Sequence, residues 1–242
     1  MIKIVNLTKN YGNLIAVNNI NLEIAENQIY ALLGLNGAGK TTLIKMLSCL
    51  TRPTSGNAFI FDKSILTHAQ EIKQEINIAP QETSVAPNLT VFENLVFIGQ
   101  VYGLNKPNAL EKAEEMIKLF ALTDKKNTLA KNLSGGQQRR LGIAMAIISN
   151  PKILFLDEPT LGLDVVARKN LWDIINKIKK NTTIILTTHY LDEVLHLANK
   201  VAIMNNGKVV ADDTVENIVA NTSSKNFEET FIKLTQGGNA DE

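Results

Sequence analysis

Residues 34–41 read GLNGAGKT and lie between a strand pattern and a helix pattern. The preceding residues 28–34 are short and apolar like a buried strand, and residues 40–50 have helical periodicity. Glycines let successive N–H groups face one point, and a helix N-terminus adds roughly half a positive charge. Lys40 can then neutralise nucleotide phosphates, and Thr41 can offer its hydroxyl to Mg²⁺. The stretch predicts a nucleoside-triphosphate site, with a structural glycine turn as the alternative; its members are Gly34, Asn36, Gly37, Ala38, Gly39, Lys40 and Thr41.

Two adjacent acids, Asp157 and Glu158, end the apolar stretch that begins at Ile153. A buried strand would place Asp157 beside the glycine-rich loop, where its charge can hold Mg²⁺, while Glu158 faces another direction. Glu158 can orient or deprotonate the water that attacks the γ-phosphate, an effect of about 10² to 10⁴ in rate. Taken alone, such a pair more often forms a solvated loop or a helix cap, but the upstream loop favours catalysis.

A second anion site is predicted at LSGGQ, residues 133–137. Ser134 is a natural N-cap for a helix that begins at Gly135, and Gly135 and Gly136 expose backbone N–H groups. One fold cannot easily direct two helix N-termini at one triphosphate from opposite sides, so this site indicates a second copy of the chain. The alternative is an ordinary serine-capped helix.

Gln81 and His189 are further candidates because each follows a predicted strand. Gln81 could bond Mg²⁺ or water between the strand 76–79 and a helical region, although a surface glutamine is the plain alternative. His189 could reach a γ-phosphate from the end of the strand 182–188, as Glu158 could from its own strand. A lone histidine is more often structural.

Composition excludes several classes of protein. The chain has 242 residues, 45% of them hydrophobic and 20% charged, which is typical of a folded globular chain and not of disorder. Its net charge of +1 gives no global basic field, so no nucleic-acid partner is expected. The single Cys49 cannot form an intramolecular disulfide, and the longest apolar run, residues 141–148, is far too short to span a bilayer.

The pattern along the chain predicts an α/β fold. Residues 3–9 and 14–24 predict a small antiparallel layer, and the apolar stretches 152–156 and 182–188 predict a parallel sheet buried on both faces. Helical periods between about 81 and 150 predict an inserted helical subdomain. The remaining predictions are a strand at 57–62, a hairpin at 201–211, a polar linker at 221–226 and a short helix at 227–234.

Six motifs in order resemble the nucleotide-binding subunit of ATP-binding cassette (ABC) transporters over nearly the whole chain. They are GLNGAGKTT at 34–42, the glutamine of APQE at 81, LSGGQ at 133–137, ILFLDEP at 153–159, LGLD at 161–164 and TTH at 187–189. LSGGQ is that family's own signature, which separates the chain from GTPases and kinases that share only the glycine-rich loop. The resemblance implies one ABC ATPase domain over 1–242 with a P-loop NTPase (RecA-like) core. That core covers about 1–82 and 150–220, the helical subdomain about 83–149, and a C-terminal helix and tail about 221–242.

The resemblance also assigns roles to individual residues. Glu158 would be the catalytic glutamate, His189 the switch histidine and Asp157 the magnesium aspartate, with Thr41 and Gln81 also at the metal. Tyr11 would stack on adenine, unless it is a plain surface tyrosine. Lys40, Thr41 and Thr42 would contact phosphate and Mg²⁺; Ser134, Gly135, Gly136 and Gln137 would contact ATP on the opposite subunit; Asp164 would cross between subunits. Leu35, Leu161 and Val165 depart from the residues frequent at those positions, but no reactive group is lost.

The resemblance finally implies partners. The family forms a head-to-tail dimer around two Mg-ATP, so we expect a homodimer, or a heterodimer with a second ABC subunit. Residues 81–104 resemble the groove that receives a helix of a separate transmembrane permease, which implies a peripheral position on the cytoplasmic face of the membrane. Residues 189–194, 201–204 and 207–208 resemble the subgroup that serves exporters of drugs, antibiotics and polysaccharides. The alternative is a soluble ABC-type ATPase in iron-sulfur cluster assembly or another non-transport role.

Overall fold

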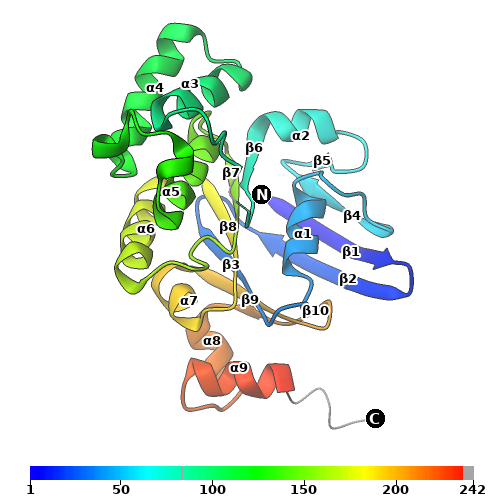
Figure 1. Ribbon diagram of the computed structural model, residues 1–242. Helices are drawn as coiled ribbons and strands as arrows, with labels where there is room; N and C mark the ends of the chain where they lie inside the picture. Colours follow the sequence, from blue (N-terminus) through cyan, green and yellow to red (C-terminus); the bar gives the residue numbers. More distant parts are fainter. Residues whose placement is uncertain (83, 237–242) are drawn as a thin grey trace.

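A computed structural model describes residues 1–82 and 84–236 of the chain, which form two sheets surrounded by helices (Figure 1). The larger sheet has six strands in the order β10-β9-β3-β8-β7-β6. Every neighbouring pair from β9 to β6 is parallel, and only β10 is antiparallel to its neighbour. The predicted mostly parallel sheet is therefore confirmed. Its strands are β3 (Ile29–Leu33), β6 (Ile76–Ala79), β7 (Ile153–Asp157), β8 (Thr183–Thr188), β9 (Lys200–Asn205) and β10 (Lys208–Asp213).

The second sheet is the predicted antiparallel layer, with two strands more than the N-terminal pattern alone indicates. Its order is β2-β1-β4-β5, formed by β1 (Ile2–Tyr11), β2 (Leu14–Ile24), β4 (Ser55–Ile60) and β5 (Lys63–Ser64). The strand expected over 57–62 ends at Ile60 because Phe61 and Asp62 turn the chain with φ of 50° and 62°. This turn lets β5 pair with β4.

The helices cover the larger sheet and extend from one end of it. Figure 1 shows α3 (Val91–Val101) and α4 (Lys106–Leu119) together at that end, with α5 (Gly135–Ile147) between them and the strands. Helix α4 begins at Lys106 because the Asn105 side chain accepts a hydrogen bond from Asn108 N, which caps the helix. The others are α1 (Lys40–Leu47), α2 (Ala69–Glu75), α6 (Val165–Ile178), α7 (Leu191–Leu197), α8 (Val215–Asn221) and α9 (Phe227–Gln236), with single 3₁₀ turns at Thr123–Lys125 and Ala130–Asn132.

Some predicted boundaries were wrong. Helix α1 ends at Leu47, not at residue 50, because Cys49 takes a left-handed φ of 57°. Helices α2 and α8 were not predicted, since each has seven residues and shows little periodicity. The tail predicted from residue 237 onward lies outside the described residues.

The core has two parts, one on each face of the six-stranded sheet. Alternate residues of β3 point to opposite faces, so Ala31 packs with one part and Leu32 with the other. All residues of β3, β7 and β8 are buried, which confirms that the sheet is covered on both faces. Among the described residues, no helix combines the length and the apolar character that crossing a bilayer requires.

Candidate active site

A cavity of about 670 Å³ lies where β3 and β8 end, and we call it the loop cavity. Strands β3, β8 and β7 are parallel neighbours, so the segments that follow them meet at one edge of the sheet. The glycine-rich loop follows β3, Glu158 follows β7 and His189 follows β8. The structure therefore brings these predicted residues together. The cavity is lined by Tyr11, Leu14, Ile15, Ala16, Asn36, Gly37, Ala38, Gly39, Lys40, Thr41, Thr42, Gln81, Glu158, Leu161, His189 and Asn206.

Two glycines of the loop are required by close backbone contacts. Gly34 lies so near β9 that a Cβ there would be 2.5 Å from the carbonyl oxygen of Met204. Gly39 has a φ of 101°, and a Cβ there would be 2.3 Å from the carbonyl oxygen of Ala16. The tip of the β9–β10 hairpin also supports the loop, because Gly207 N donates to Ala38 O at 3.1 Å. The loop is thus held between β2 and this hairpin.

Lys40 is 5% exposed and is held by the loop that precedes it. Its ammonium donates to the carbonyl oxygens of Gly34 at 2.7 Å and Leu35 at 3.2 Å. It also forms an ion pair with Glu158, 3.3 Å from Oε1. A positive charge is therefore fixed in the loop cavity, beside a carboxylate.

Asp157 is held in place by two hydroxyl groups. Its Oδ1 accepts hydrogen bonds from Thr41 Oγ1 at 3.0 Å and from Thr187 Oγ1 at 2.6 Å. Thr187 Oγ1 also accepts from the backbone N–H of Glu158 at 2.9 Å, so one buried hydroxyl orients both acids. Thr187 belongs to the TTH motif, but this role of its hydroxyl was not predicted. Its polar group inside a buried apolar strand was the available signal.

Glu158 and His189 contact each other directly. His189 Nδ1 lies 2.9 Å from Glu158 Oε2, while Glu158 Oε1 faces Lys40. Glu158 has a φ of 49°, which is uncommon for a residue with a side chain. The two adjacent acids face different partners, as their positions in the sequence predict. Glu158 is buried and lines the loop cavity, where its carboxylate can accept a proton.

Gln81 and Tyr11 also line the loop cavity. Gln81 follows β6 after one intervening residue and reaches the same cavity as Glu158. Tyr11 is 48% exposed at the end of β1, beside the apolar residues Leu14 and Ile15. An exposed aromatic ring next to a triphosphate site is suited to stacking on a nucleotide base.

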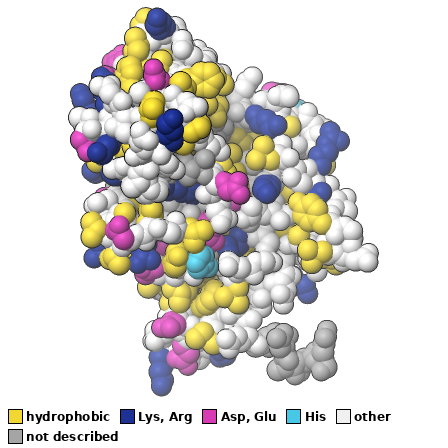
Figure 2. Space-filling model, viewed as in Figure 1, with side chains coloured by type: hydrophobic (Ala, Val, Ile, Leu, Met, Phe, Trp, Pro, Cys, Tyr) yellow, Lys and Arg dark blue, Asp and Glu magenta, His cyan; other side chains and the backbone are white. Residues whose placement is uncertain are grey.

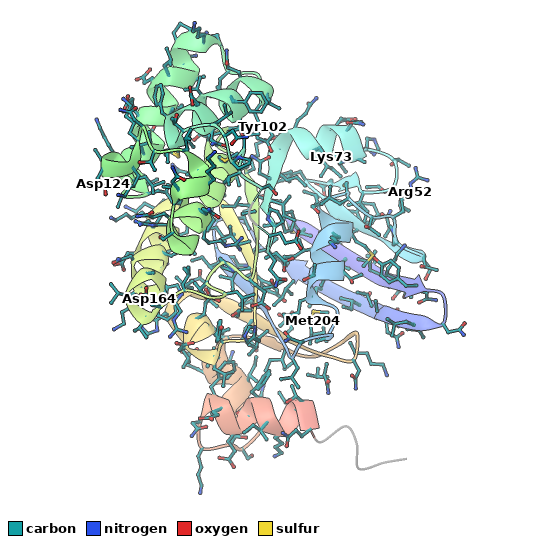
Figure 3. All side chains as sticks on the ribbon, viewed as in Figure 1. Arg52, Lys73, Tyr102, Asp124, Asp164 and Met204 are labelled. Atoms are coloured by element: carbon teal, nitrogen blue, oxygen red, sulfur yellow. The ribbon has the colours of Figure 1, made fainter. Side chains whose placement is uncertain are left out.

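Ser134, Gly135, Gly136, Gln137 and Asp164 line a separate cavity of about 470 Å³, which we call the signature cavity. It shares no lining residue with the loop cavity. Figure 3 shows Asp164 near α6 and Met204 near the glycine-rich loop, apart from each other. Within one chain, the structure therefore keeps this second group of predicted residues away from Lys40.

Hydrogen bonds at the signature cavity order the starts of two helices. Ser134 Oγ accepts from Gln137 N at 3.3 Å, and Gln137 Oε1 accepts from Ser134 N at 3.0 Å, which is a capping box for α5. Asp164 Oδ1 accepts from Ala167 N at 2.8 Å and caps α6. The two helix N-termini give this cavity a local preference for negative charge.

Two buried charged groups behind the site were not predicted. Glu193 on α7 is fully buried and accepts a hydrogen bond from Trp172 Nε1 at 3.2 Å. Burial raises the pKa of the Glu193 carboxyl above its usual value. Arg139 on α5 is 6% exposed, and burial lowers the pKa of its guanidinium. Neither residue stands out from its neighbours in the sequence.

Comparison with known proteins is consistent with this geometry. The family model for "ABC transporter" matches residues 17–161. The chain is 40% identical over 219 residues to the daunorubicin/doxorubicin resistance ATP-binding protein DrrA of Streptomyces peucetius, an alignment covering 90% of this chain and 66% of DrrA. It is 42% identical over 194 residues to the human phospholipid-transporting ATPase ABCA3, covering 80% of this chain and 11% of ABCA3. The chain thus spans less than two thirds of the length of these relatives.

Solved structures give the same result. The structure of an ATP-binding subunit of an ABC transporter superposes with a TM-score of 0.86 at 25% identity, covering 97% of this chain and 99% of the other. The dimeric cassette MJ0796 in a post-hydrolysis state, bound to ADP and Pi, has a TM-score of 0.81 at 26% identity and covers 88% and 98%. Because the family model covers more than half of the sequence, the chain belongs to the ABC transporter family and has the fold of its ATP-binding cassettes.

Proposed function

We propose that this chain binds and hydrolyses ATP as the cassette subunit of an ABC transporter. The observation that carries the proposal is the position of Glu158 between Lys40 at 3.3 Å and His189 at 2.9 Å, at the mouth of the glycine-rich loop. A carboxylate held in this way can orient or deprotonate water next to a phosphate site. The relatives DrrA, an ATP-binding protein, and ABCA3, an ATPase, support the same activity.

Residues at the loop cavity fit a magnesium ion: Thr41 and Gln81 line the cavity, and Asp157 lies next to the lining, bonded to Thr41. Mg²⁺ prefers oxygen ligands, and Asp157 Oδ1 and Thr41 Oγ1 are two such atoms, 3.0 Å apart. Gln81 lines the same cavity with a side-chain amide. We propose that these three residues hold the ion. When bound with ATP, Mg²⁺ would neutralise charge on the phosphate oxygens.

Lys40 would leave Glu158 and pair with the phosphates when ATP binds. In the described structure the ammonium of Lys40 pairs with the Glu158 carboxylate. A triphosphate carries more negative charge, so it would attract the ammonium away from Glu158. Glu158 would then be free to accept a proton from water, and His189 would hold its other oxygen in place.

We further propose that two chains act together, in a homodimer or in a heterodimer with a second ABC subunit. Each chain has a loop cavity and a signature cavity without a shared lining residue. A head-to-tail pair would place the signature cavity of one chain over the loop cavity of the other, and both cavities favour anions. Dimeric structures of the cassette MJ0796 support this arrangement.

The helical region is the proposed contact with a separate transmembrane permease. Phe97 is 55% exposed and Val101 is 61% exposed on α3, next to a groove of about 220 Å³. Figure 2 shows hydrophobic side chains gathered on this part of the surface. We propose residues 83–149 as a subdomain that receives the permease, on the cytoplasmic face of the membrane, and residues 1–82 and 150–220 as the ATPase core. The name of DrrA, a drug-resistance protein, favours export.

The Glu158→Gln variant tests the proposal. It keeps the size of the side chain but removes the proton acceptor, so ATP turnover should fall about 10² to 10⁴-fold while ATP binding remains. ATP should then convert the variant to a dimer, measured by light scattering. Glu216→Gln on the exposed surface of α8 is the matched control and should behave as the wild type. Unchanged turnover, or a monomer at every ATP concentration, would contradict the proposed roles.

A further inference from the structure

Arg139 donates hydrogen bonds to four backbone carbonyl groups in two other segments. Its Nε donates to Pro159 O at 2.9 Å, and its Nη2 donates to Asp157 O at 2.7 Å. Its Nη1 donates to Gln81 O at 3.2 Å and also to Pro80 O. The planar guanidinium carries five donors in a fixed geometry, so it suits this arrangement of acceptors.

The four carbonyls belong to the segments that carry Gln81 and Glu158. Pro80 and Gln81 follow β6, whereas Asp157 ends β7 and Pro159 lies two residues further on, so that they flank Glu158. Arg139 therefore holds the backbone on both sides of the residue with the left-handed φ of 49°. It lies on α5 two residues after Gln137, so it connects the signature helix to both loops.

Burial lowers the pKa of the Arg139 guanidinium, while three nearby acids oppose this effect. The side chain is buried, and the acids Asp157, Glu193 and Glu158 are its charged neighbours. Lysine would keep the charge but offers one tetrahedral ammonium, which cannot reach carbonyls on several sides with the same geometry. The contact thus depends on the shape of the guanidinium as well as on its charge.

We propose that Arg139 is a positioning residue that holds the Gln81 and Glu158 loops in one fixed relation to the signature helix. A displacement of α5 relative to the sheet would then move both loops together. This inference rests on the proposed ATPase function of the loop cavity. A residue that only stabilised α5 would affect folding, whereas the proposed role of Arg139 links the position of α5 to the rate of hydrolysis.

Arg139→Met and Arg139→Lys in the full chain test this inference, with Arg168→Lys as the matched control. Arg168 on α6 is also mostly buried and pairs with Asp192 at 3.2 Å, but it lines neither cavity. ATP-binding stoichiometry counts the folded chains, and kcat is expressed per bound ATP. We expect the two Arg139 variants to keep KM within about threefold and to lose at least tenfold in kcat. The control should keep kcat within about twofold.

Hydrogen–deuterium exchange of the nucleotide-free chain adds a readout without turnover. Exchange should rise together in the peptides containing Gln81 and Glu158 in both Arg139 variants, and not in the control. Wild-type kcat per bound ATP in Arg139→Lys or Arg139→Met would overturn the inference, as would a rise in only one of the two peptides. If the wild type itself hydrolyses no ATP, the proposed function fails, and the exchange result still decides whether Arg139 couples the loops.

Discussion

Thr187 is the residue whose substitution most directly tests the geometry of the paired acids. Thr187→Val keeps the branched shape of the buried side chain but removes its hydroxyl. Two hydrogen bonds are lost, one to the Asp157 carboxylate and one from Glu158 N. A bond to a charged group contributes about 1.5–3 kcal/mol and a neutral one about 0.5–1.5 kcal/mol, so the free energy of unfolding should fall by about 2–4.5 kcal/mol. For a chain of this size the Tm should fall by roughly 4–18 °C.

The same substitution should slow hydrolysis. Both acids lose the group that orients them, and a displacement of about 1 Å in a catalytic group costs on the order of 10²-fold in rate. We therefore expect kcat to fall by about 10 to 100-fold in a phosphate-release assay. Affinity for ATP measured without Mg²⁺ should remain, because Lys40 and the glycine-rich loop are unchanged.

Thr183→Val at the other end of β8 is the matched control. Thr183 is buried, and its Oγ1 accepts one hydrogen bond from Asn27 N at 2.9 Å, far along the strand from the site. Its loss should cost about 0.5–1.5 kcal/mol of stability and leave kcat unchanged. A Thr187→Val chain with the kcat of the wild type would refute the conclusion that this hydroxyl orients Asp157 and Glu158.

Two further variants test the loop and the buried acid. Gly39→Ala would place a Cβ 2.3 Å from Ala16 O at a φ of 101°, so ATP affinity measured by equilibrium dialysis should fall at least tenfold. Gly99→Ala in α3 meets only contacts of 3.4 Å or more, and affinity should not change; equal affinity in both variants would contradict the steric argument. For Glu193, the folded chain raises the pKa above the usual 4.5, so the wild type loses stability as the pH rises from about 4.5 through the folded pKa. Glu193→Gln lacks this loss. The free energy of unfolding of the variant in urea, minus that of the wild type, should therefore rise with pH by up to about 1.4 kcal/mol per pH unit. A difference that is constant from pH 5 to 8 would refute the raised pKa of Glu193.

The sequence predicted those parts of the fold and site that depend on local pattern. The apolar run before Gly34 and the glycines after it are adjacent in the chain, so strand, loop and helix follow from one stretch. Glu158 and His189 could be expected at one place because each ends a buried strand, and parallel strands end at the same edge. Their mutual contact at 2.9 Å is consistent with that expectation.

Long-range contacts between single atoms could not be predicted. Arg139 bonds to Pro80, 59 residues away, and to carbonyl groups that every residue type carries, so no pattern indicates its partners. Thr187 has the same limitation, because its bonds to Asp157 and Glu158 depend on the register of two strands that are 30 residues apart. Helix α8 was missed for a different reason, since seven residues give too few turns to show a period.

The glycine-rich loop is supported by a residue far along the chain, Gly207 at the tip of the β9–β10 hairpin. Gly207 donates to Ala38 O and accepts from Asn18 N, although it lies well beyond residue 161, where the family match ends. A shortened chain that stopped after His189 would contain Lys40, Glu158 and His189 but would lack Gly207, whose N–H donates to the carbonyl oxygen of Ala38. ATP would then have to order the loop as it binds, at about 1–2 kcal/mol for each residue fixed. High affinity for ATP therefore requires β9 and β10 as well as the glycine-rich loop, because the tip of their hairpin holds the loop in place before ATP binds.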